Sequence, residues 1–153
     1  MIWLMEFAEN KKEVERQLTS KTDILIEHIL YLIMDKNNKA AQHWKTEIYA
    51  FISSVKKLSG KNKFPTKSQI YDWTYGKSED LVNDSAWLFV LVQDVTEKEN
   101  FYSPRDIDDI MKRLDGFCKK YFTWLASNLS SVGRVTQSSV IQELNSLITE
   151  YSY

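Results

Sequence analysis

Lysines and aromatic residues are concentrated between positions 56 and 77, a composition that suits contact with nucleic acid or with a protein partner. The stretch holds six lysines and a single acid, Asp72, together with two tyrosines, one phenylalanine and one tryptophan. Lysine ammonium groups neutralise phosphates, and aromatic rings stack on bases. The candidate nucleic-acid or partner patch consists of Lys56, Lys57, Lys61, Lys63, Lys67, Tyr71, Trp73 and Tyr75.

Three features of the sequence weigh against a nucleic-acid site in this stretch. Arginine, whose planar guanidinium group binds phosphate in a fork, is absent from it. The whole chain has a net charge of −1 at pH 7, whereas a dedicated nucleic-acid-binding domain is usually strongly basic. Ile70 and Trp73 are spaced to pack inward from one side of a short helix. We therefore predict that the aromatic side chains mostly close the core, and that the lysines form a solvated edge that can serve as a docking patch.

The acidic residues are concentrated in the next part of the chain. Residues 78 to 109 contain nine acids against two basic residues. Adjacent blocks of opposite sign either complement each other within one fold or meet separate partners. Asp106, Asp108 and Asp109 fall near the start of a predicted helix, where carboxylates oppose the helix dipole. That interpretation is favoured over a metal site, which needs further oxygen ligands from elsewhere in the chain.

Residues suited to catalysis are scarce in this sequence. The only histidines, His28 and His43, are predicted on separate helices and do not form a metal-ligand spacing such as H-E-x-x-H. We expect His28 to be a hydrogen-bonded core residue and His43 to be exposed or at the boundary. Cys118, the only cysteine, lies on an apolar stripe, and the four scattered glycines do not form a phosphate-binding loop. We therefore predict that the protein is not an enzyme and uses no metal or cofactor.

Helical periodicity determines where these residues are placed. Between residues 39 and 59, apolar side chains follow spacings of three and four, which puts them on one stripe of a helix. Asn37 or Asn38 can cap its start, and Gly60 stands where a C-terminal glycine cap is expected. The stripe consists of Ala41, Trp44, Ile48, Phe51, Val55 and Leu58.

A longer stripe with the same spacing predicts a helix over residues 104 to 130. Ser103 can cap this helix, and Pro104 suits its first position. The stripe resembles a heptad pattern, so we expect it to offer a helical face to another protein or to a second copy. The candidate helix–helix interface consists of Ile107, Met111, Leu114, Tyr121 and Leu125.

The two ends of the chain are also predicted to be helical. Residues 140 to 151 keep helical spacing, and Ser139 with Gln142 matches a capping box. The first 18 residues have apolar side chains on roughly one side. A second, nearly buried helix is expected to begin after Ser20, so the sequence predicts two helices in this region.

Residues 79 to 98 contain the run AWLFVLV, whose composition alone also fits a buried strand. Their length, the flanking acids and a cap at Ser78 favour a helix, and no second strand is available for pairing. A short helix is expected between Pro65 and Gly76. Only four glycines and two prolines are present, which favours helices over turn-rich β folds. The sequence thus predicts an all-α protein, with residues 1–153 forming a single compact, bundle-like domain of six or seven helices.

The apolar segments are too short to predict a membrane protein. The longest, ILIEHILYLIM, has 11 residues and contains Glu27 and His28, whereas a membrane-spanning helix needs about 20. The opening residues MIWLMEFAEN lack the basic region of a secretory signal. We therefore predict a cytoplasmic protein with no membrane contact.

The run LIEHILYLIMDKNNKAAQHWKTEI resembles the middle of a bacterial helical family known as domain of unknown function twenty-nine. That family carries a His-Leu-Leu-Lys-like motif on one helix. After a short polar loop it has a Ser-Trp pair, with an isoleucine four residues past the tryptophan. Here His28 opens the first match, and Trp44 and Ile48 form the second, while Tyr31 and His43 replace the lysine and the serine. The resemblance implies a helical fold but no activity, because the family has no assigned function.

Two functions fit these patterns. The first is a small, non-catalytic helical interaction protein, such as a subunit, adaptor or inhibitor, that binds a protein partner or associates with itself. It agrees with the long apolar stripe and with a content of five tryptophans, eight tyrosines and seven phenylalanines, because aromatic residues are enriched at binding hot spots. The alternative is a nucleic-acid-binding helical subunit that uses the lysine-rich, aromatic stretch 56–77.

Overall fold

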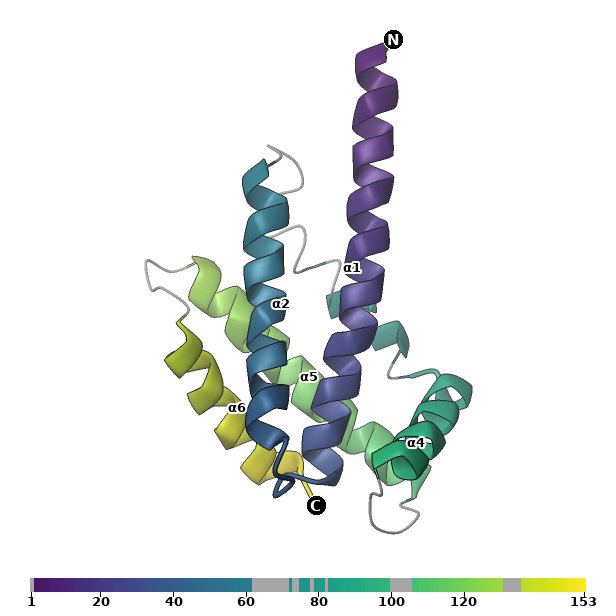
Figure 1. The fold of residues 1–153 in the computed structure, drawn as a ribbon, viewed down its shortest axis with the longest axis vertical. Helices are drawn as coiled ribbons and strands as arrows, with labels where there is room; N and C mark the ends of the chain where they lie inside the picture. The colour runs from purple at the N-terminus through teal and green to yellow at the C-terminus, as the bar shows by residue number, and fades with distance from the viewer. Residues whose placement is uncertain are drawn as a thin grey trace.

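The computed structural model is built from α-helices, and no strand occurs in the part of the chain that it describes (Figure 1). The all-α prediction is therefore confirmed. The helices have the bounds α1 Ile2–Met34, α2 Ala41–Lys61, α4 Ser85–Glu99, α5 Ile107–Ser130 and α6 Gln137–Tyr151. The structure describes residues 2–61, 72, 75–77, 79–81, 83–99, 106–130 and 136–153.

Helix α1 is a single element, so the prediction of two helices separated near Ser20 was wrong. Serine and threonine near this position suggested a cap, but the threonine hydroxyls bond within the helix instead. Thr19 Oγ1 donates to the Glu15 carbonyl at 2.8 Å, and Thr22 Oγ1 donates to the Leu18 carbonyl at 2.6 Å. With these groups satisfied and no glycine or proline to interrupt it, the helix continues.

A short turn reverses the chain between α1 and α2. The Asn38 side chain organises this turn: its Oδ1 accepts from the Ala40 amide at 2.8 Å, and its Nδ2 donates to Asp35 at 3.0 Å. The asparagine predicted to start α2 is therefore Asn38. Gly60 lies inside α2, which ends at Lys61, so its predicted place as a C-terminal cap was wrong.

The other helices begin one or more residues away from their predicted caps. Asp106 caps α5 by accepting from the Asp108 amide at 3.0 Å, whereas the predicted cap, Ser103, lies outside the described residues. Helix α6 is capped by Thr136 with Ser139 in a capping box, three residues earlier than the predicted pair. Thr136 has extended backbone angles and a side-chain hydroxyl that accepts from the Ser139 amide, so it serves the same purpose one turn sooner.

Residues 86–92 are helical, which confirms the helix predicted for the AWLFVLV run. The chain leaves the helical conformation at Asn83 and Asp84, however, so residues 79–81 are separate from α4. The Asp84 side chain starts α4 by accepting from the Trp87 amide at 3.0 Å. The predicted cap at Ser78 and most of the predicted helix between Pro65 and Gly76 lie outside the described residues.

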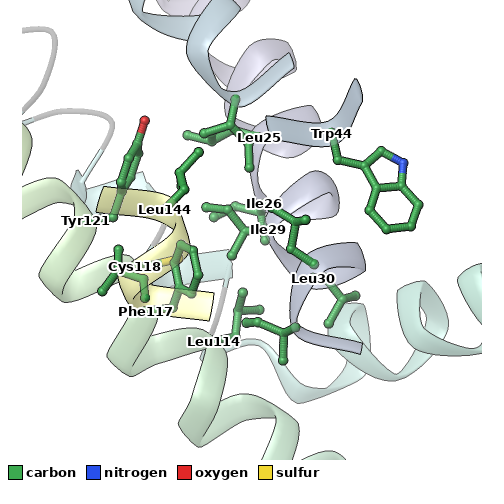
Figure 2. Close-up of a cluster of buried hydrophobic side chains, with 14 of the residues drawn as sticks. Leu25, Ile26, Ile29, Leu30, Trp44, Leu114, Phe117, Cys118, Tyr121 and Leu144 are labelled. Atoms are coloured by element: carbon green, nitrogen blue, oxygen red, sulfur yellow. The ribbon is translucent and has the colours of Figure 1, made fainter. Parts of the chain in front are cut away.

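Helices α1, α2, α5 and α6 enclose one hydrophobic core. Figure 1 shows α1 and α2 side by side, with α5 and α6 packed against them and α4 on the outside of α5. With 33 residues at about 1.5 Å each, α1 is roughly 50 Å long, and its N-terminal part rises beyond the bundle. Figure 2 shows α1, α5 and α6 meeting in the core through Leu25, Ile26, Ile29, Leu30, Leu114, Phe117, Cys118, Tyr121 and Leu144.

Candidate interaction surfaces

The lysine-rich stretch begins at the end of α2. Lys57 is exposed there, whereas for Lys56 and Lys61 the structure describes only the helical backbone. The remaining lysines and two aromatic residues of the candidate patch lie outside the described residues: Lys63, Lys67, Tyr71 and Trp73. Whether the patch binds nucleic acid or a protein therefore stays a prediction.

Tyr75 is the aromatic residue of this patch that the structure describes, and it packs inward. Its ring is half-buried and meets the Phe122 ring edge-on, with 6.1 Å between the centroids. A hydrogen bond to Glu79, together with partial burial, raises the pKa of the Tyr75 hydroxyl. This contact agrees with a core-closing role for Tyr75 and makes its ring less accessible for stacking on a base.

The apolar stripe of α5 is used inside the chain. Leu114, Tyr121 and Leu125 are fully buried, and Ile107 and Met111 are half-buried against the same core. The five residues do form a helix–helix interface, but their contacts are with helices of the same chain. A second copy reaches the buried members only if the bundle opens, so surfaces for partners must be sought elsewhere.

The two histidines and the cysteine differ in how far they are buried. The Nδ1 atom of His28 lies 2.7 Å from the Ile24 carbonyl oxygen, as expected for a hydrogen-bonded histidine, but the side chain is only half-buried, so its predicted place in the core was wrong. His43 is exposed, as predicted, with its Nε2 3.9 Å from Glu47. Burial strongly raises the pKa of the Cys118 thiol, which keeps it protonated and unreactive in the folded protein. Among the described residues, no three His, Cys, Asp or Glu side chains are grouped to hold a metal ion.

Helix α4 exposes apolar side chains on its outer surface. Its inner side buries Leu88, Leu91 and Val92 against the core, while Phe89 and Val90 remain 48% and 64% exposed. A helix that is apolar around its whole circumference is normally covered on all sides. The outer stripe, which we name the α4 face, consists of Ala86, Phe89, Val90, Gln93 and Glu97.

Exposed carboxylates lie at both ends of α4. Asp84 precedes the helix, and Glu97 lies on its last turn. Asp106 and Asp108 are exposed at the start of α5, which lies beside α4 in Figure 1. The α4 face therefore has an apolar centre with a carboxylate near each end, which we name its acidic rim, and this arrangement favours a partner with basic groups over nucleic-acid phosphates.

A second surface, the α1–α2 groove, is a hollow of about 210 Å³ between the first two helices. Its floor is apolar and includes the buried side chains of Leu25 and Phe51. Ile24 forms part of its edge and is 46% exposed, although the next two apolar residues of α1, Leu25 and Ile26, are buried. The hollow is lined by Lys21, Ile24, Leu25, Glu47, Ala50, Phe51 and Ser54.

No described helix is long and apolar enough to cross a membrane. Comparison with family models, curated proteins and solved structures found no match. The resemblance of residues 25–48 to domain of unknown function twenty-nine stays a prediction.

Sequence reasoning missed both the α4 face and the α1–α2 groove. A signal for the α4 face was present, because the unbroken run AWLFVLV leaves some apolar side chains on every side of a helix. The run around Ile24 carries a similar signal. In both places the sequence indicates surplus apolar surface, but which side chain stays exposed depends on how the neighbouring helix packs.

Proposed function

We propose that this protein is a non-catalytic interaction protein that binds a protein partner through the α4 face. The observation that carries the proposal is the exposure of Phe89 and Val90 on the outer side of a helix whose inner side is already buried. Adjacent exposed apolar residues framed by polar ones are typical of binding sites. Aromatic residues such as Phe89 are also enriched at the centre of interfaces.

Covering these two side chains provides a modest driving force. Full burial of a valine or phenylalanine contributes roughly 1.5–3 kcal/mol, so covering the exposed halves of both contributes about 2 kcal/mol. Stable association needs more than this, because binding must first offset the lost freedom of the two partners. The rim must therefore contribute as well.

The charge of the rim defines the kind of partner. Asp84 and Glu97 place exposed carboxylates near the two ends of the α4 face, and Asp106 and Asp108 are exposed at the start of the neighbouring α5. A partner with an apolar centre ringed by lysine or arginine matches that surface and is steered to it over a distance of about 10 Å at moderate salt. The proposed partner is thus a protein with a basic, apolar-centred patch.

Site-specific cross-linking tests this proposal. A photoreactive phenylalanine analogue is placed at Phe89 and, as a matched control, at Asn145, which is exposed on α6. Both variants are illuminated in cells that carry the gene, and the cross-linked proteins are identified. A protein captured from position 89 and not from position 145 is then purified and its affinity for the wild-type chain is measured.

The expected result is a basic partner whose affinity falls about tenfold or more with Phe89→Asp, since central interface residues typically contribute this much. Raised salt should also weaken the complex by screening the acidic rim. Equal capture from both positions, or unchanged affinity of Phe89→Asp, would refute the α4 face as the binding site. Salt-sensitive binding of labelled DNA or RNA, measured by fluorescence anisotropy and weakened by Lys57→Glu, would instead favour the alternative function.

A further inference from the structure

The α1–α2 groove has a defined register. Lys21 Nζ donates to Ser54 Oγ at 3.3 Å, and the rings of Tyr31 and Trp44 are in contact, with 5.2 Å between centroids. From the first contact to the second, the residue number rises by ten on α1 and falls by ten on α2. The two helices therefore run antiparallel, and their register is constant between the two contacts. By the same register, Ile24 lies opposite Phe51.

Opposite charges lie at the two ends of this groove. Lys21 stands at one end, beside Ser54, and Glu47 stands at the other end, two turns earlier on α2. Seven residues of helix separate Ser54 from Glu47, or about 10 Å. Between the charges, the floor of Leu25 and Phe51 is apolar.

This pattern is complementary to itself. A two-fold axis that crosses the groove at its midpoint brings the Lys21 end of one copy onto the Glu47 end of the other, and the reverse pairing follows by symmetry. The same operation places the apolar centres against each other. Most other charge patterns, such as a groove with two basic ends, would instead place like charges together and oppose dimer formation.

The shape of the surface also provides both halves of a contact. Ile24 projects as an exposed apolar side chain at the edge, and the hollow beside it is lined by Ala50 and Phe51. In a symmetric pair, the Ile24 side chain of each copy can enter the hollow of the other, as a knob enters a hole. Dimer formation would then cover two exposed isoleucines and fill two hollows.

From the charge pattern and this fit we infer that the α1–α2 groove binds a second copy of the chain, forming a symmetric dimer through Lys21, Ile24 and Glu47. The inference concerns a different surface from the α4 face and does not rest on the proposed function. The two surfaces lie on different helices, so a dimer can present two α4 faces to partners.

Sedimentation equilibrium over a concentration series tests the dimer directly. The wild-type chain should shift from the mass of one chain to the mass of two as concentration rises. Ile24→Asp places a charge in the apolar centre and should weaken the dimer at least about tenfold. Ser20→Asp adds the same charge at an exposed position of α1 that does not line the hollow, and it should leave the dimer intact.

A charge exchange gives a second test that does not depend on Ile24. Lys21→Glu and Glu47→Lys should each weaken self-association, because each symmetric pair then contains like charges. Mixing the two variants should restore dimers. In a mixed dimer one copy carries acids at both positions and the other carries lysines at both, so each of the two contacts again joins opposite charges. Circular dichroism on each variant confirms that the helices remain folded.

Three results would each overturn the inference. The first is a wild-type chain that stays monomeric at millimolar concentration, which corresponds to a binding free energy weaker than about −4 kcal/mol. The second is a dimer that Ile24→Asp leaves unchanged, and the third is a pair of charge variants that self-associate as well alone as when mixed. A dimer that Phe89→Ala weakens and Ile24→Asp does not would assign self-association to the α4 face instead. In that case the groove would be excluded as the dimer interface.

Discussion

Helix α5 packs against the end of α6 and against α4. These two elements differ in how much of their surface is covered by the rest of the chain. At the end of α6, Arg113 Nη1 donates to the carbonyl oxygens of Tyr151 and Ser152 at 2.9 and 3.1 Å. Its guanidinium group lies 3.9 Å from the centre of the Tyr153 ring, and its Nε donates to Asp109 at 2.9 Å. These bonds satisfy carbonyls that a helix end leaves without an internal partner.

Close packing also covers the surface between α5 and the end of α6. Gly116 lies against the Tyr151 ring, in a space that an additional β-carbon would have to share with that ring. The Tyr153 amide donates to the Ile33 carbonyl at 3.0 Å, which joins the chain end to α1. At α4, by contrast, only the inner side is engaged, and Phe89 and Val90 face outward. The comparison separates a surface that the chain closes by itself from one that it leaves open.

Two phenylalanines provide the largest expected contrast between these regions. Phe117 is fully buried between α5 and its neighbours, so Phe117→Ala should lower the free energy of unfolding by about 3–5 kcal/mol. Phe89→Ala should lower it by only about 1 kcal/mol, because about half of this side chain is already in water. Urea unfolding of both variants measures the difference. Comparable losses would show that Phe89 is held in the fold and would remove the contrast.

Gly116 gives the next effect in size, through the contact with Tyr151. Gly116→Ala should destabilise the protein by about 1–2 kcal/mol, because overpacking against the ring exceeds the gain in helix propensity. With Tyr151→Ala in place, the same substitution should stabilise by up to about 1 kcal/mol, since only the propensity gain remains.

A double-mutant cycle by thermal or urea unfolding measures this change of sign. Gly76→Ala is the control for the substitution itself, because a β-carbon there meets no atom within 4 Å. If Gly116→Ala has the same effect with and without Tyr151, the ring does not limit the packing of α5 against α6.

The smallest expected effect is a pH dependence at Asp109. Hydrogen bonds from the Tyr153 hydroxyl and then from Arg113 lower the pKa of this carboxyl group. A carboxyl group whose pKa is lowered by folding binds fewer protons in the folded state than in the unfolded state. Its contribution to the free energy of unfolding is therefore complete at a pH above its ordinary pKa of about 3.9. That contribution is lost as the pH falls through the lowered pKa of the folded protein.

The difference in unfolding free energy between the wild type and Asp109→Asn should therefore shrink as the pH is lowered from about 5 to about 2. Asp108→Asn removes the same charge from an exposed position on the same turn and controls for the helix dipole. A difference that stays constant over this range would show that the Tyr153 and Arg113 contacts do not depend on the charge of Asp109.

Most of the helices were predictable from the sequence, whereas the break predicted near Ser20 and several starting points were wrong. Spacings of three and four identified α2, α5 and α6, because apolar side chains must share one side of a helix to reach a core. The caps were misplaced where several suitable side chains stand close together, as Thr136 and Ser139 do before α6. Either residue can accept the first amide bonds, and the choice between them depends on how far the helix extends along its neighbours.

Contacts between distant residues were beyond sequence reasoning. Nothing in the pattern around Arg113 indicates that it binds carbonyls nearly forty residues later, at Tyr151 and Ser152. Likewise, the stripe from Ile107 to Leu125 was predicted to offer a face to another protein, yet its central members are buried within the chain. A stripe shows that a helix needs a partner surface, but not whether that surface belongs to the same chain.

The sequence by itself determined that the chain forms helices and which residues of each helix share a side. Both properties follow from local backbone geometry, which repeats every 3.6 residues whatever lies nearby. Only the tertiary structure decided which apolar side chains stay exposed, because burial depends on area removed from water by elements far away in the sequence. Phe89 is no less apolar than Phe117, and the difference between them is that other parts of the chain cover Phe117 completely and Phe89 only by about half.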